Sequence, residues 1–131
     1  MKQIHFVYFN AGGGHRAAAL ALQQSIRDQR RPWRVNLLNL SDVIDPQGGF
    51  RKLLGVSLED FYNLRLRKGW TAGLAQELKL LHGLIKLAHQ PMVKALSQHW
   101  ASTEPDMVVS LVPNFNRAMM KAVQQALPGV P

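Results

Sequence analysis

A histidine follows three consecutive glycines in the stretch FNAGGGHRAAA, residues 9–19. Gly12, Gly13 and Gly14 can adopt positive φ angles and leave room for a ligand against the backbone. Their N–H groups, together with those of a following helix's first turn, suit a phosphate or a developing anion. The positive end of that helix disfavours an imidazolium, so His15 is expected to act as a neutral proton acceptor. This pattern is typical of a site that activates a hydroxyl beside a phosphorylated leaving group.

Two familiar phosphate-binding motifs are absent from this stretch. A Walker loop needs a lysine and a hydroxyl residue after its last glycine, and neither is present. A dinucleotide fingerprint needs a third glycine where Arg16 or Ala17 stands. A nucleotide- or phosphate-ligand-binding enzyme of Rossmann type therefore stays open as an alternative.

The other histidines have no metal-ligand spacing as a set, so we expect no metal site. The sequence places one in a strand and three in helical stretches, and all four are expected to be structural: His5, His82, His89 and His99.

The elements that position the glycine–histidine motif begin with a strand over Ile4–Phe9, a nearly continuous apolar run. A helix is predicted from Arg16 to about Gln29, with Ala18, Leu22 and Ile26 on its apolar face. A second strand follows over Trp33–Leu40, and then a loop over Asp42–Gly49. This strand–helix–strand order indicates a parallel sheet with a right-handed crossover.

The second half of the chain is expected to begin with basic helices over residues 50–100. Ser57 and Asp60 form a capping box, residues 74–85 carry an apolar helical stripe, and Pro91 is expected to start a further helix. A third strand over Asp106–Val112 and a short final helix complete a thin sheet. The expected fold class is α/β, a Rossmann-like parallel sheet with flanking helices in a single domain spanning residues 1–131. We expect the sequence to be the N-terminal part of a longer protein.

Charge and composition narrow the function classes. The 131 residues carry 16 Lys and Arg against 8 Asp and Glu, and residues 50–100 alone hold eight of these cations against three acids. Such an excess favours polyanionic partners, and a basic nucleic-acid-binding module is a second alternative. The chain has no cysteine, which favours a reducing compartment. It also lacks a signal peptide and a long apolar run, so a soluble or peripheral protein is expected.

The motif AGGGHRAAALAL after an N-terminal strand resembles the signature of the monogalactosyldiacylglycerol synthase family, which includes processive diacylglycerol glucosyltransferases. The later stretch EPDMVVSLVPNFNRA is similar to that family's segment in which a Pro-Asp pair opens a strand ending at a proline. Val112 stands where relatives often have a histidine. A basic, aromatic helical insertion lies between these two segments in the family, so the resemblance spans nearly the whole chain.

The resemblance implies the N-terminal, acceptor-binding domain of an inverting glycosyltransferase of GT-B architecture. It implies transfer of a hexose from a UDP-sugar to a lipid such as diacylglycerol, with a separate C-terminal domain binding the donor. His15 would be the general base, oriented by Asp42 or Asp106 as the candidates by topology. The residues Gly12, Gly13, Gly14, Pro113 and Asn114 would line the cleft. No cofactor and no nucleic acid partner are expected on this interpretation, and the protein would be cytoplasmic, bound peripherally to a membrane.

An aromatic and basic segment within the expected insertion is a candidate for membrane contact. Its residues would place aromatic rings at the lipid boundary and cations on anionic headgroups: Phe61, Tyr62, Arg65, Arg67, Lys68 and Trp70.

Replacing Arg65, Arg67 and Lys68 together by Ser is expected to weaken binding to anionic liposomes sharply. Each near-surface cation contributes about 1 kcal/mol to such binding. Co-sedimentation with vesicles measures the effect, and unchanged binding would exclude this segment as the membrane contact.

Overall fold

The chain forms an α/β fold with a three-stranded parallel sheet. The computed structural model describes residues 1–9, 14–44, 74–112 and 115–131. The strands are β1 (Lys2–Tyr8), β2 (Trp33–Asn39) and β3 (Met107–Ser110), in the order β2-β1-β3. The predicted strands are confirmed, with the third one shorter than expected.

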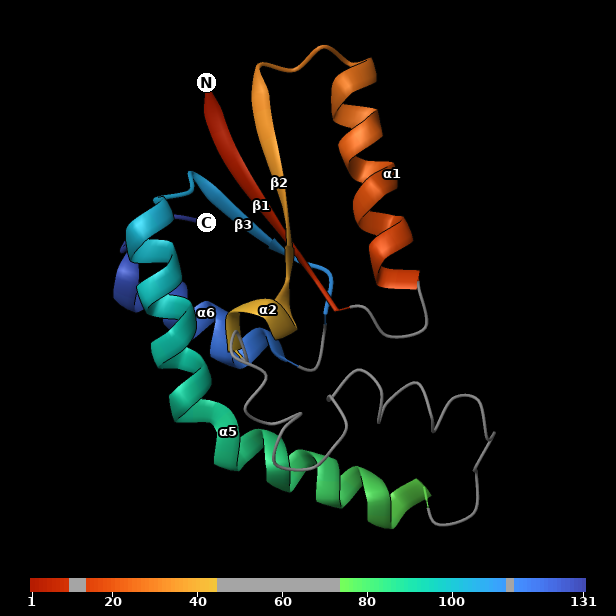
Figure 1. Cartoon of the computed structure of the whole chain (residues 1–131), viewed down its shortest axis with the longest axis vertical. Coiled ribbons are helices and arrows are strands. Elements are labelled where there is room, and N and C mark those ends of the chain that lie inside the picture. The colour runs from red at the N-terminus through yellow and green to blue at the C-terminus, as the bar shows by residue number, and fades with distance from the viewer. Residues whose placement is uncertain (10–13, 45–73, 113–114) are drawn as a thin grey trace.

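Four helices flank this sheet among the described residues. They are α1 (Gly14–Asp28), α2 (Leu40–Ile44), α5 (Leu74–Thr103) and α6 (Asn116–Ala126). Figure 1 shows α1 on one side of the sheet and α2, α5 and α6 on the other. The predicted loop from Asp42 is wrong at its start, since α2 continues through Ile44.

Strand register assigns side chains to the two faces of the sheet. His5 on β1 is paired with Asn36 on β2 and with Val108 on β3, and Val7 is paired with Leu38. Paired residues point to the same face, so these side chains share the face toward α5. The alternate residues Ile4 and Phe6 are buried on the opposite face. β1 is therefore covered on both faces, as its apolar composition predicts.

The hydrophobic core lies between the inner face of the sheet and the second half of α5. Val7, Leu40, Leu96 and Trp100 are fully buried there. α6 contributes a stripe of small and flexible apolar residues to the same cluster: Ala118, Met119, Ala122 and Val123. The core thus joins segments from both ends of the chain.

α5 is one helix of 30 residues that contains Pro91. A separate helix beginning at Pro91 was expected, and this expectation is wrong. Proline lacks an N–H and its ring crowds the preceding turn, so a proline inside a helix produces a kink. Figure 1 shows α5 changing direction between its two halves. Met92 and Val93, next to the proline, are buried in the core and hold the continuation in place.

The apolar face of α1 differs from the predicted one. Ala18 is exposed and Leu22 is 42% exposed, whereas Ala19 is fully buried. The inward stripe consists of His15, Ala19, Gln23 and Ile26, at spacings of four, four and three. Gln23 donates from Nε2 to the carbonyl oxygen of Val35 at 3.4 Å, which ties the helix to β2. This hydrogen bond helps to decide which face of α1 turns toward the sheet. Apolar periodicity alone predicts a different face.

A basic corner connects α1 to β2. It consists of Arg27, Arg30, Arg31 and Arg34, all exposed, with Trp33 among them. Arg30 has a φ of 52°, and the Arg31 N–H donates to the carbonyl oxygen of Ile26 at 3.2 Å. These features close the helix end in a position that usually selects glycine. The Arg31 guanidinium lies over the Trp33 ring at 5.7 Å.

No helix within the described parts of the chain is long and apolar enough to cross a membrane.

Replacing Leu96 by Ala is expected to lower the free energy of unfolding by about 2–5 kcal/mol, because it leaves a cavity in the core. Leu87→Ala, on the same helix but 80% exposed, is the matched control and is expected to cost about 0.5 kcal/mol or less. Urea unfolding followed by circular dichroism measures both. Equal losses would contradict the packing of α5 on the sheet.

Candidate functional site

The two segments that sequence analysis assigned to one cleft follow adjacent strands at the same edge of the sheet. The glycine stretch follows β1, and the proline–asparagine pair follows β3, which pairs with β1 in parallel. The Phe9 and Phe115 rings lie 5.9 Å apart between centroids, with a tilt of 43°. Both rings are buried. Phe9 stands just before the glycine stretch and Phe115 just after the proline–asparagine pair, so this contact brings the flanks of the two segments together.

His15 occupies the first turn of α1, on the stripe that faces the sheet. Its Nδ1 is buried and has no hydrogen-bond partner among the described residues. A buried imidazole nitrogen left without a partner costs about 1–3 kcal/mol. Ligands of α/β folds bind at the carboxyl edge of the parallel sheet. A buried polar atom without a partner there makes His15 a candidate for contact with a ligand.

Gly14 is the one glycine of the motif that the structure describes. It begins α1 with an ordinary backbone conformation, and a Cβ added to it would meet no atom within 4 Å. Positive φ is therefore not the reason for glycine at this position. The open space beside its backbone leaves room for a ligand.

Polar side chains lie at the ends of the two outer strands at this same edge. The Ser110 hydroxyl, at the end of β3, donates to Asn116 Oδ1 at the start of α6 and accepts from the Val112 N–H. Asn39 Oδ1, at the end of β2, accepts from the backbone and hydroxyl of Ser41. These hydrogen bonds fix the backbone path from the end of β2 into α2 and the position of Ser110 relative to the start of α6.

Of the two carboxylates considered as orienting groups for His15, one lies at the wrong edge. Asp106 precedes β3, and its Oδ2 accepts from the Gln3 N–H at 2.7 Å, at the amino edge of the sheet. It cannot reach a histidine at the carboxyl edge, because the strand separates them. Asp42 is exposed on α2, directly after the carboxyl end of β2. α2 lies on the side of the sheet opposite α1, so no contact joins Asp42 to His15 among the described residues.

The remaining predicted site residues lie outside the described residues. These are Gly12 and Gly13, Pro113 and Asn114, and the whole membrane-contact segment Phe61, Tyr62, Arg65, Arg67, Lys68 and Trp70.

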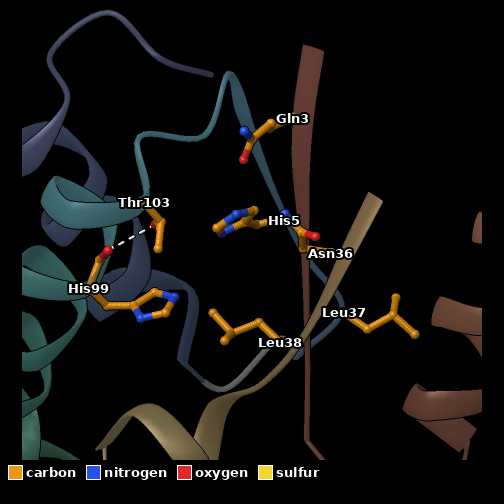
Figure 2. A pocket seen from close by; sticks show the side chains of 7 residues that line it. All are labelled: Gln3, His5, Asn36, Leu37, Leu38, His99 and Thr103. Atoms are coloured by element: carbon orange, nitrogen blue, oxygen red, sulfur yellow. Dashed lines mark hydrogen bonds between the residues drawn. The ribbon is translucent and has the colours of Figure 1, made fainter. Parts of the chain in front are cut away.

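A second polar site, which sequence analysis did not find, lies at the amino half of the inner sheet face. A pocket of about 300 Å³ is lined there by His5 on β1, Asn36 on β2, and His99 and Thr103 on α5, together with Gln3, Leu37 and Leu38. Figure 2 shows His5 and His99 turned toward the same space, with Leu37 directed away from it. The two imidazole rings lie 6.1 Å apart between centroids, tilted by 49°.

Both histidines of this pocket are disfavoured as cations. Burial lowers the pKa of His5 below its ordinary value of 6.5, and the nearby His99 lowers that pKa further. Burial also lowers the pKa of His99. His5 is only 4% exposed, and its Nδ1 is buried without a hydrogen-bond partner. Two neutral imidazoles therefore face the pocket at neutral pH.

The signal for this pocket in the sequence is a polar residue at the centre of a buried strand, His5 in IHFVYF. Its partner across the pocket comes from a helix far along the chain, which periodicity does not reveal. Within the described residues, no group of three or more His, Cys, Asp and Glu side chains is arranged to hold a metal ion.

Comparison of the chain with protein-family models, with curated proteins and with solved structures gives no match.

The free energy of unfolding is expected to fall as the pH drops below about 6.5. Because folding lowers the pKa of His5 and His99, the unfolded chain takes up protons that the folded chain refuses. The loss begins near the unfolded value of 6.5 and ends when the pH passes below the lowered folded pKa values. Urea unfolding at a series of pH values between 8 and 5 measures it.

The variant that tests this assignment is His99→Gln, with His89→Gln on the same helix as control. His99→Gln removes one titrating imidazole and also the charge that lowers the pKa of His5. The free energy of unfolding of this variant is therefore expected to depend less on pH. If the control flattens the pH dependence as much as His99→Gln does, the pocket histidines are not its source.

Proposed function

We propose that this chain is the N-terminal, acceptor-binding domain of an inverting glycosyltransferase of GT-B architecture. The enzyme transfers a hexose from a UDP-sugar to a lipid acceptor such as diacylglycerol, with His15 as general base. The observation that supports this most directly is the buried, unpaired Nδ1 of His15, immediately after the glycines and on the first turn of α1. The Phe9–Phe115 contact supports the placing of two loops in one cleft.

The proposed reaction forms one bond and breaks one bond. The acceptor hydroxyl oxygen attacks the anomeric carbon of the sugar from the face opposite the nucleotide, and the bond from that carbon to the diphosphate oxygen breaks. His15 takes the hydroxyl proton, and the UDP leaves with the bonding electron pair. Attack from the opposite face inverts the anomeric configuration. A positioned base of this kind contributes about 10²–10⁴-fold to the rate.

The other residues of the cleft have supporting roles in this proposal. The N–H groups of Gly12, Gly13 and Gly14 and the positive end of α1 face the negative charge of the donor diphosphate or of a lipid headgroup. Pro113 and Asn114, which follow β3 in the sequence, are proposed to line the same cleft. In this proposal the donor is bound by a C-terminal domain, and the aromatic and basic segment over residues 61–70 holds the enzyme peripherally on the cytoplasmic membrane surface.

Two rival functions predict different outcomes. A Rossmann-type enzyme for another phosphate ligand would use the same glycine loop without needing His15. A nucleic-acid-binding module would account for the net charge of +8, but not for the unpaired histidine beside the glycines. Salt-sensitive binding to RNA or DNA, with indifference to lipid, would favour that second rival.

The test uses the longest natural form of the protein with diacylglycerol vesicles and labelled UDP-galactose or UDP-glucose. Wild type is expected to form glycolipid, and His15→Ala is expected to form it at least about 100-fold more slowly, because it lacks the base. His89→Ala, a partly buried histidine on α5, is the matched control and is expected to keep full activity. The product is measured by thin-layer chromatography and scintillation counting.

Two results would overturn part or all of the proposal, and a third would show damage to the fold. Glycolipid formed equally by wild type and His15→Ala would keep the enzyme class and discard His15 as the base. Loss in both histidine variants would indicate damage to the fold rather than to the chemistry. Absence of transfer from either donor by a folded protein would contradict the function itself.

A further inference from the structure

The inner face of the sheet changes character along its strands. Its carboxyl half presents Val7 and Leu38 to the core, with Phe9 just after β1 and Leu40 at the start of α2 beside them. Its amino half presents His5 and Asn36 side by side in register, with Gln3 two residues before His5. Polar side chains on a sheet face covered by a helix need hydrogen-bond partners, because burial removes water from them.

The α5 residues above the amino half are polar as well. His99 and Thr103 face this part of the sheet, while Leu96 and Trp100 fill the core beside it. Thr103 donates its hydroxyl hydrogen to the carbonyl oxygen of His99 at 2.8 Å, which leaves the hydroxyl oxygen free to accept (Figure 2). Sheet and helix thus converge with polar groups on a pocket of about 300 Å³, the lower end of the range for small-molecule sites.

The lining of this pocket offers hydrogen-bonding groups to a ligand. The buried Nδ1 of His5 has no hydrogen-bond partner among the described residues. The side-chain amides of Gln3 and Asn36 are half-buried and line the pocket. Each side-chain amide offers both a donor and an acceptor, and each neutral imidazole does the same. This pocket combines an unpaired buried nitrogen with two histidines of lowered pKa, which makes it a candidate binding site.

The chemistry of the lining selects the kind of ligand. None of the seven lining residues is Asp, Glu, Lys or Arg, so nothing in the pocket neutralises an ionic ligand. Leu38 and the faces of the two imidazole rings supply apolar, flat surface. The complementary molecule is uncharged, has a flat ring, and carries adjacent donors and acceptors on its edge.

We infer that this pocket binds an uncharged nitrogen heterocycle of the size of a nucleobase, held at its edge by His5, Asn36 and His99. The site is separate from His15, since it lies at the amino half of the sheet and His15 lies at the carboxyl edge. The inference does not depend on the proposed glycosyltransferase activity. A His15→Ala variant binds the heterocycle normally even if it transfers no sugar.

The probes are adenosine and thymidine, which carry such an edge and no charge near pH 7.5. Binding is followed by the C–H proton NMR signals of the histidines during titration. We expect saturable shifts of the His5 and His99 signals, with a Kd of about 10⁻⁴ M for a ligand of this size. Glucose, which has hydroxyls but no flat ring, and Zn²⁺, which binds imidazole without an amide edge, are titrated in parallel.

The variants separate recognition from folding. His99→Phe keeps a ring and removes the polar edge, and Asn36→Leu removes the amide of a half-buried residue. Each is expected to weaken binding about tenfold, since it leaves a polar group of the ligand unpaired. His89→Phe, on the same helix and outside the pocket, is the matched control and is expected to bind as wild type does.

Several outcomes would overturn the inference. The inference is wrong if neither adenosine nor thymidine shifts the His5 and His99 signals. It is also wrong if His99→Phe binds the nucleosides as tightly as His89→Phe does. Saturable binding of glucose or Zn²⁺ without binding of the nucleosides would assign the pocket to a different class of ligand.

Discussion

The burial of β1 on both faces and along both edges is the constraint on which the rest of this structure depends. The strand pairs with β2 on one side and β3 on the other, and Ile4, His5, Phe6 and Val7 are all buried. Parallel neighbours require crossover segments, and two buried faces require helices above and below. Those requirements place α1 on one face and α5 with α6 on the other. They also bring the chain after β1 and the chain after β3 to one edge, where Phe9 meets Phe115.

Local composition was sufficient to predict the strands and most helices, because short apolar runs bounded by turn residues leave few alternatives. Local composition does not predict features that depend on contacts between residues far apart in the sequence. The face of α1 is set partly by the bond from Gln23 to Val35, and a polar residue gives no signal in a search for apolar periodicity. The sequence predicts a helix start at Pro91, yet one helix runs through it, with the neighbouring Met92 and Val93 buried in the core.

The two polar sites differ in how visible they are in the sequence. His15 was found because its glycines precede it directly, and the unpaired Nδ1 adds a structural reason to single it out. The His5–His99 pocket was missed because its halves come from a strand and a helix far apart in the chain. Their meeting follows from how α5 packs on the sheet, which depends on the whole core. Asp106 precedes its strand, so in a parallel sheet it lies at the amino edge, where its Oδ2 accepts from the Gln3 N–H, and not beside His15.

The basic corner between α1 and β2 has a consequence for self-association. The outer edge of β3 receives a bond from its own chain, since the Val108 N–H donates to the carbonyl oxygen of Pro131. β2 has a strand partner on one edge only among the described residues, so its outer edge has backbone groups with which a second copy can pair. Arg34 in β2 and Arg30 and Arg31 just before it would place like charges against each other in such a pair. Repulsion between these arginines opposes edge-to-edge aggregation, and added salt, by screening it, removes that protection.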